Sequence, residues 1–412
     1  MNKKKESKVV PNVRFKGFTD VWKQRKLGDV SEIIGGGTPS TNHPEYWDGD
    51  IDWYSPAEIL DQIYVKRSRR RITQLGYDNS SAKLLPPGTV LFTSRAGIGK
   101  TAILSQKSCT NQGFQSIVPH ENELDTYFIF SRTNELKRYG ELVGAGSTFT
   151  EVSGKQMSAM NLMLPTTIQE QQLIGQFFKK LDCLITLHQQ KITLLIKLKK
   201  AMLEKMFPKK GTVIPEFRFN GFANAWEQRK FSQGVSEIGD GLHGTPTYCD
   251  NGNVFFINGN NLVDGKIVIN SETKTVDETQ QSLSDKDLDD NTILLSINGT
   301  IGNLAYYSGE KLMLGKSAAY IKVSAFDIKF VYTYLQTPSV HSYFMNSLTG
   351  TTIKNLGLKA IREMKLDIPQ DIDEQKKIGD YFSTLDNLIT LHQRKIDKIK
   401  NMKKVMLDQM FI

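Results

Sequence analysis

The chain has 412 residues, and 53 lysines and arginines against 44 aspartates and glutamates give a formal net charge of +9 at pH 7. This length allows two or three domains with cores of their own, and 39% hydrophobic and 24% charged residues are typical of a globular protein. The positive charge favours a polyanionic partner such as nucleic acid.

Residues 1–10, "MNKKKESKVV", form a basic tail without the apolar stretch of a signal peptide. No run of about 18 apolar residues occurs, which excludes a membrane-spanning helix. Cys109, Cys183 and Cys249 are far apart and in no C-x-x-C pattern, so neither a disulfide framework nor a zinc or other metal site is indicated. We expect a cytoplasmic protein that does not bind a membrane.

Residues 11–163 read as a first globular domain. It opens with "PNVRFKGFTDVWKQRK" (11–26) and continues with short β-rich runs such as "GTVLFTS" (88–94), separated by glycine and proline. This pattern predicts an α/β (α+β) or mainly β domain of about 150 residues.

Three glycine-rich stretches stand out in this domain: "GGTPS" (36–40), "SRAGIGKTAIL" (94–104) and "GAGSTFTEVSGKQM" (144–157). Loops of this kind expose N–H groups that can contact DNA phosphates, and polar neighbours can read base edges. The run "KRSRRR" (66–71) is either a solvated face or a phosphate contact. The DNA-binding candidates in this domain are Thr38, Lys66, Arg67, Arg69, Arg70, Arg71, Arg95, Lys100, Ser147 and Thr148.

Residues 164–210 have the periodicity of a coiled-coil helix. Apolar positions alternate in steps of four and three from Ile174 to Met206, with His188 within the seam. Pro165 precedes this helix and Pro208 ends it, so it should run for about 39 residues.

The chain then repeats itself at an offset of 204 residues. "PEFRFNGFANAWEQRK" (215–230) returns the opening segment, residues 211–367 form a second domain, and 368–412 repeat the helix with His392 in place of His188. Glycine-rich stretches recur at 243–247, 297–307 and 348–361, whereas most of the intervening sequence differs. The DNA-binding candidates in this domain are His243, Thr245, Asn258, Asn260, Asn261, Asn298, Thr351 and Thr352.

An antiparallel pairing of the two helices within one chain solves the geometry of such a repeat, because it gives one domain at each end and an internal pseudo-two-fold axis. A parallel or intermolecular pairing is the alternative. The two seam histidines are interpreted as polar residues that set the register rather than as a metal site or pH switch.

The stretch "SRAGIGKT" (94–101) approaches the phosphate-loop pattern G-x-x-x-x-G-K-[ST], but Ser94 stands where the first glycine belongs. The second copy has Asn303 and Leu304 in place of Lys100 and Thr101. A nucleotide site cannot lose its lysine and hydroxyl, so this stretch is interpreted as a fold element used twice.

The duplicated "FxGFxxxWxQRK" segments, the glycine loops and the "IxEQxxIGxxFxxLDxLITLHQxK" helices together resemble the HsdS-type specificity subunits of type I restriction-modification systems. The resemblance covers Pro11 to Phe411. It implies two target-recognition domains held apart by the helices, each reading half of a bipartite, asymmetric site in double-stranded DNA. It also implies a subunit that catalyses nothing.

The resemblance further implies the partners and their cofactors. Two modification subunits would bind S-adenosylmethionine and methylate adenine, and restriction (motor-nuclease) subunits would need ATP and magnesium, with no cofactor in this chain. Candidate docking residues beside the helical seams are Phe177, Phe178, Leu184, Leu187, Tyr381, Phe382, Leu388 and Leu391. The rival hypotheses are an NTPase or fused methyltransferase, and a coiled-coil scaffold that binds proteins without DNA specificity.

Overall fold

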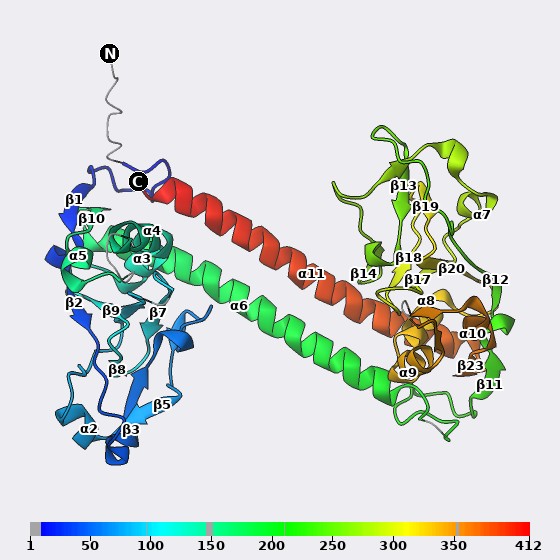
Figure 1. Cartoon of the computed structure of the whole chain (residues 1–412), viewed down its shortest axis with the longest axis horizontal. Helices are drawn as coiled ribbons and strands as arrows, with labels where there is room; N and C mark the ends of the chain where they lie inside the picture. Colours follow the sequence, from blue (N-terminus) through cyan, green and yellow to red (C-terminus); the bar gives the residue numbers. More distant parts are fainter. Residues whose placement is uncertain (1–9, 96, 146–150, 210, 352–353) are drawn as a thin grey trace. The chain divides into compact units, whose positions relative to one another are not determined.

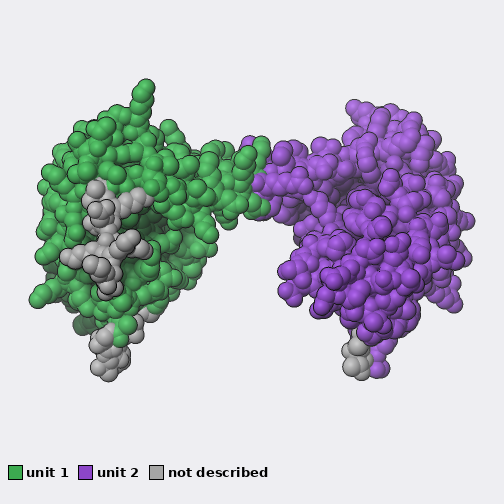
Figure 2. Space-filling model, turned by 90° about the horizontal axis from the view of Figure 1, so that it is seen from above, with its two compact units in different colours: residues 1–188, 395–412 green, residues 189–394 purple. Residues whose placement is uncertain are grey.

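A computed structural model describes residues 10–95, 97–145, 151–209, 211–351 and 354–412. The chain forms two compact units, unit 1 with residues 1–188 and 395–412 and unit 2 with residues 189–394 (Figure 2). The predicted segments assigned each long helix to a region of its own, whereas each compact unit contains part of both. Across the described ranges, no helix is long and apolar enough to cross a membrane.

The described residues of unit 1 form three small sheets. Short helices accompany them (Figure 1). A five-stranded sheet has the order β2 (Ser31–Gly35), β9 (Gln115–Pro119), β6 (Val90–Phe92), β7 (Thr101–Leu104) and β4 (Tyr64–Val65). A three-stranded sheet has the order β5 (Arg70–Ile72), β3 (Trp47–Tyr54) and β8 (Cys109–Thr110), and β1 (Lys23–Lys26) pairs with β10 (Asn161–Leu164). The helices are α1 (Leu27–Val30), α2 (Gln74–Asp78), α3 (Thr126–Ser131), α4 (Thr133–Gly144) and α5 (Gly154–Ser158).

Unit 2 repeats this plan with changes in its interior. A four-stranded sheet has the order β12 (Val235–Asp240), β20 (Ala318–Val323), β17 (Thr292–Ser296) and β18 (Leu304–Tyr306), and a three-stranded sheet has the order β16 (Thr275–Val276), β13 (Val254–Ile257) and β19 (Leu312–Leu314). The pairs are β11 (Glu227–Lys230) with β23 (Lys365–Ile368), β14 (Leu262–Val263) with β15 (Lys266–Ile267), and β21 (Leu348–Thr349) with β22 (Asn355–Leu356). The helices are α7 (Leu283–Lys286), α8 (Ile328–Leu335), α9 (Pro338–Asn346) and α10 (Leu358–Glu363). The two units therefore confirm a mixed α and β fold.

The two long helices are α6 (Ile168–Lys205) and α11 (Ile372–Met410), drawn in green and red in Figure 1. In unit 1 the beginning of α6 packs against the end of α11, since Lys403 Nζ lies 2.6 Å from Asp182 Oδ1. In unit 2 the end of α6 packs against the beginning of α11, since Lys199 Nζ lies 2.6 Å from Asp386 Oδ1. These contacts are the same pair with the copies exchanged, so the helices run antiparallel, as predicted.

The residues that recur at the 204-residue offset tie each globular part to its helix. Arg14 donates to both carboxylate oxygens of Glu170 at 2.6 and 2.8 Å, and Arg218 does the same with Glu374 at 2.6 and 2.7 Å. Both glutamate side chains are 1% exposed. The bond to Glu170 raises the pKa of Arg14 above its ordinary value, as expected for a cation hydrogen-bonded to a carboxylate.

The glutamine and the glycine of the repeated "EQxxIG" motif complete this junction. Gln171 Oε1 accepts a bond from the Asp125 backbone N–H, and Gln375 Oε1 accepts one from Asp327, both at 3.1 Å. The helix approaches the domain so closely that a Cβ on Gly175 would lie 2.4 Å from an Asp125 carboxylate oxygen. The repeated motif is therefore a docking device between helix and domain.

The predicted seam packs into the core of a unit near the beginning of each helix. Ile174, Phe178 and Leu181 pack in the core of unit 1, and Ile378, Phe382 and Leu385 pack in the core of unit 2. Phe178 and Phe382 are fully buried, which corrects their prediction as partner-docking residues. Their phenyl rings fill the cores instead, where Phe178 stacks on Phe411 and Phe382 lies tilted against Phe207. His188 and His392 are half-buried.

Candidate nucleic-acid interface

Three loops meet at one end of the five-stranded sheet of unit 1, because β2 and β6 end where β9 begins. The Gly37 N–H donates to Thr110 O and the Ser94 N–H donates to Gly113 O, both at 2.9 Å. The hydroxyl of Thr38 donates to the side-chain oxygen of Gln112. The structure thus brings the predicted residues Thr38, Arg95 and Lys100 to a common edge.

The stretch around Lys100 is a turn between antiparallel strands β6 and β7. Gly97 and Gly99 have φ angles of 102° and 93°, and the Thr93 hydroxyl donates to Gly97 O at 2.7 Å. In unit 2, the turn between β17 and β18 has Gly299 and Gly302 at 73° and 92°. A phosphate loop leads from a strand into a helix, so these β-hairpins confirm a repeated fold element and not a nucleotide site.

Two tryptophans hold the "GGTPS" loop in place. The indole N–H of Trp53 donates to Gly37 O at 2.8 Å, and that of Trp47 donates to Ser40 O at 3.1 Å. The two rings make an edge contact at 5.2 Å, and the Arg70 guanidinium carbon lies 3.5 Å from the Trp47 ring centroid. Arg70 therefore lies beside the loop that carries Thr38.

The rest of the basic run flanks Arg70. Lys66, Arg67 and Arg69 are exposed, and Arg71 is half-buried. The Arg69 backbone N–H donates to Glu58 Oε2 at 2.7 Å, which fixes the chain but leaves the guanidinium outside. The run therefore presents side chains to solvent in the way that phosphate contacts require.

Unit 2 has a corresponding loop cluster built from different residues. The Leu242 N–H donates to Leu314 O at 2.7 Å, the Ile297 N–H to Ser317 O at 3.0 Å, and the Gly259 N–H to Ser317 Oγ at 2.9 Å. These bonds join the 241–247 loop region, the 297–303 turn and the 315–317 turn. The same part of each unit thus carries loops of different sequence.

The structure corrects the prediction for two of the asparagines in this cluster. Asn261 accepts the Asn258 N–H at 3.0 Å and donates to Val268 O at 3.1 Å, so both ends of its amide are used inside the unit. Asn258 accepts a bond from the Ser317 hydroxyl at 2.9 Å. Both cap a short 3₁₀ turn, Gly259–Asn261, in which the exposed Asn260 projects outward.

The other predicted residues of unit 2 have varied surroundings. His243 is exposed and its Nε2 lies 2.9 Å from Asp240 Oδ2, Thr245 and Thr351 are exposed, and Asn298 is half-buried. Ser147, Thr148 and Thr352 lie outside the described residues.

Sequence reasoning missed several residues at these edges. Gln112 and Lys316 are exposed at equivalent turns, and Trp47 and Trp53 support the first cluster. No repeat signal could have found the turns, because "NQG" (111–113) and "GKS" (315–317) share no pattern.

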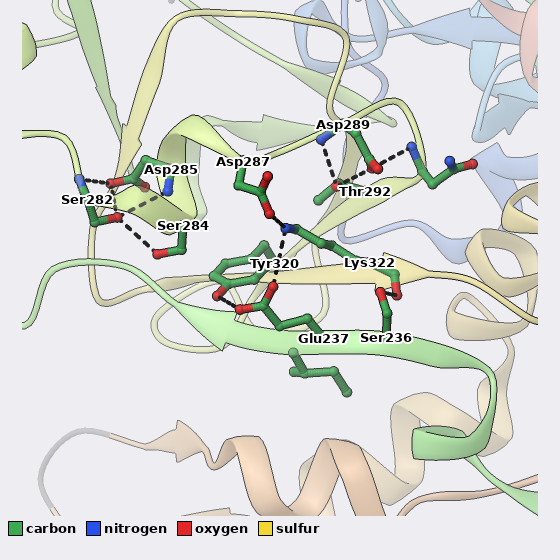
Figure 3. Close-up of polar contacts among 12 residues, drawn as sticks. Ser236, Glu237, Ser282, Ser284, Asp285, Asp287, Asp289, Thr292, Tyr320 and Lys322 are labelled. Carbon is green, nitrogen blue, oxygen red and sulfur yellow. Dashed lines mark hydrogen bonds and ion pairs between the residues drawn. The ribbon is translucent and has the colours of Figure 1, made fainter.

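A polar network elsewhere in unit 2 has the opposite charge character (Figure 3). Lys322 lies 3.2 Å from Glu237 and also pairs with Asp287, and Tyr320 donates to Glu237 at 2.6 Å. The tyrosine bond, followed by the lysine, lowers the pKa of Glu237, and the Asp287 bond raises the pKa of Lys322. Asp289 and Asp290 are exposed nearby in sequence, so acidic side chains predominate on this surface.

The long helices expose apolar side chains in equivalent places. Leu184 and Leu187 on α6 are 43% and 45% exposed, and Leu388 and Leu391 on α11 are 37% and 45% exposed. Phe177 and Tyr381 are half-buried beside Phe15 and Phe219. The four leucines remain candidates for partner docking.

The sequence model of the type I restriction modification DNA specificity domain matches the chain twice, at residues 19–197 and 226–401. The chain belongs to this family. It is 30% identical over 264 residues to the type I restriction enzyme MjaIX specificity subunit of Methanocaldococcus jannaschii, covering 61% of this chain and 60% of that protein.

Other relatives agree with this family. The EcoR124I/EcoR124II specificity subunit of Escherichia coli is 31% identical over 178 residues, covering 41% of this chain and 43% of that protein. The chain thus spans 60% or less of the length of these two relatives. The S subunit structure from M. genitalium has a TM-score of 0.65 at 13% identity, covering 98% of this chain and 99% of that one, so it has the same fold.

Proposed function

We propose that this chain is the DNA sequence-specificity subunit of a type I restriction-modification complex. Each unit reads one half of a bipartite, asymmetric site in double-stranded DNA, and the chain itself catalyses no reaction. One observation carries the proposal: the two units share their junctions with the helices, residue for residue, but differ in the loops at the sheet ends. Two equivalent units with different loops are suited to reading two different half-sites.

The helices serve the assembly in this proposal. They set the spacer between the half-sites, and the exposed leucines at 184, 187, 388 and 391 dock two modification subunits, one on each copy. Those subunits bind S-adenosylmethionine and methylate adenine after flipping it from the stack. Restriction subunits supply the motor and nuclease, with ATP and magnesium.

An exchange of domain interiors tests this proposal. The segment between β1 and β10, residues 27–160, is replaced by that of a relative with another target, and the chain is expressed with its modification partner in a host without other methylation systems. Sequencing of methylated adenines should show one bipartite motif, of which only one half changes. Exchange of residues 231–364, the equivalent segment between β11 and β23, should change only the other half.

The absence of a methylated motif would contradict the proposal. If the complex assembles with an active methyltransferase but methylates no defined motif, the chain does not specify DNA. A coiled-coil scaffold that binds proteins would then be the better account.

A further inference from the structure

We propose that Arg70 reads the guanine of a G·C base pair in the half-site recognised by unit 1, with Trp47 as its positioning platform. The inference rests on the proposed function and names one specificity-determining residue within it. Its basis is the arrangement of the guanidinium on the indole, which the basic run in the sequence did not reveal.

The guanidinium of Arg70 is held in position by an aromatic ring, while its N–H groups remain available as hydrogen-bond donors. Its central carbon lies 3.5 Å from the Trp47 ring centroid and 6.0 Å from that of Trp53, and the first is a stacking distance. Within the described part of the chain, no hydrogen bond or ion pair engages its side-chain N–H groups, and the residue is exposed. A stacked guanidinium keeps its N–H donors free in the plane of the group.

The platform is rigid because it is part of a buried cluster. Trp47 and Trp53 are 7% and 5% exposed and pack with Ile72, which is fully buried on the same strand as Arg70. Side chains two residues apart on a strand share a face, so Arg70 continues the face of this cluster to the surface. The two indole N–H bonds to Gly37 O and Ser40 O fix the "GGTPS" loop to the same cluster.

This geometry is suited to one base in particular. A bidentate contact from arginine to O6 and N7 of guanine is the commonest specific contact in the major groove. It requires a flat donor pair whose direction is set in advance, and stacking supplies that direction without occupying the donors. The exposed Lys66, Arg67 and Arg69 lie next in the chain and can contact the adjacent phosphates.

Unit 2 lacks the same arrangement. In unit 1, Arg70 is paired in register with Trp53, and in unit 2 the Phe256 N–H donates to Lys274 O at 2.8 Å, so Lys274 has the corresponding place. Lysine has no planar fork, and no cation–ring contact involves Lys274 among the residues that the structure describes. The inferred guanine contact is therefore specific to one half-site.

The test uses the complex of the full chain with its modification subunit. Methylation rates are measured on duplexes in which each base pair of the half-site assigned to unit 1 is replaced in turn. Arg70→Lys keeps the charge and removes the fork. We expect discrimination at one G·C position to fall roughly 5- to 150-fold, with the other positions and the second half-site unchanged.

Two variants complete the experiment. Arg69→Lys makes the same change at the neighbouring exposed arginine and should leave discrimination at every position unchanged. Trp47→Leu keeps Arg70 but removes its platform, and it should relax the same G·C position as Arg70→Lys. Retained discrimination at the second half-site and a cooperative thermal unfolding transition show that each variant is folded, although Trp47→Leu should lower the melting temperature because it shrinks a buried cluster.

Unaltered discrimination in Arg70→Lys, or a half-site for unit 1 without any G·C pair, would overturn the assignment and leave the proposed function intact. A wild-type complex that methylates no motif would overturn the proposed function, and the assignment with it.

Discussion

At the scale of single residues, the buried ion pairs at the helix junctions have a measurable role. Glu170→Gln leaves Arg14 without its charged partner at a site where the glutamate side chain is 1% exposed. We expect unit 1 to lose about 3 kcal/mol of unfolding free energy, because breaking a buried pair leaves an uncompensated charge. Urea unfolding followed by hydrogen exchange resolves the loss by unit.

A matched control lies in the same unit. Glu123 pairs with Arg25 at 3.0 Å, but both side chains are more than 40% exposed. Glu123→Gln should change the unfolding free energy by less than about 1 kcal/mol. Equal losses in the two variants would show that burial of the Arg14 pair contributes nothing special.

The cysteines provide a second test at this scale. Burial raises the pKa of Cys109 to about 12, and its side chain is fully buried. Because the thiolate is the reactive form, Cys109 should resist maleimide at pH 8 in the folded chain and react after unfolding in urea. The exposed Cys183 should react in both conditions. Rapid labelling of Cys109 in the native protein, read by peptide mass spectrometry, would contradict the packing of strand β8.

At the scale of elements, the exposed leucines of α6 predict a docking surface. Leu184→Asp combined with Leu187→Asp should weaken binding of one modification subunit by at least about tenfold, because a charge in an apolar contact is not compensated. Titration calorimetry or native mass spectrometry measures this change. The leucines are 43% and 45% exposed, so the substitutions should leave the fold stable.

Thr186→Asp is the control for this surface. Thr186 is exposed on the same helix but lies about 200° around the axis from Leu184. It should bind the modification subunit as the wild type does. If Thr186→Asp weakens binding as much as the double leucine variant does, the effect belongs to the helix as a whole and not to the leucine face.

The sequence predicts the elements that both copies share but not the loop clusters between them. The long helices, their antiparallel pairing and the repeated strands follow from periodicity and the 204-residue offset, since these positions carry packing that both copies need. The loop clusters could not be predicted in the same way. Gln112 and Lys316 meet Thr38 and Leu242 only through strand order, and the roles of Asn258 and Asn261 as turn caps depend on hydrogen bonds that no local pattern indicates.

At the scale of the whole molecule, the net charge of +9 should make the affinity of the complex for DNA decrease as the salt concentration rises. The logarithm of the binding constant should fall linearly with the logarithm of salt concentration, and Arg67→Gln should reduce the slope by about 1 if this side chain contacts a phosphate. Fluorescence anisotropy of the assembled complex at several salt concentrations measures both quantities.

Lys286→Gln is the matched change of charge on the acidic surface of unit 2. This exposed lysine lies among the exposed Asp287, Asp289 and Asp290, where we expect no contact with DNA phosphates, so the slope should stay as in the wild type. Equal slopes for both variants would mean that the complex senses only net charge and that the run at 66–71 is a solvated face.

The junction between each unit and its helix also bears on inheritance. Arg14, Glu170 and Gln171, like Arg218, Glu374 and Gln375, all lie outside the stretch between the paired strands. Genetic exchange within that stretch therefore leaves both buried arginine–glutamate pairs in place. The bonds of Gln171 and Gln375 go to backbone N–H groups inside the stretch, those of Asp125 and Asp327. Under the proposed function, a lineage can acquire a new half-site by replacement of this stretch alone, with one crossover on each side of it, while the two ion pairs of the old scaffold pass on unaltered.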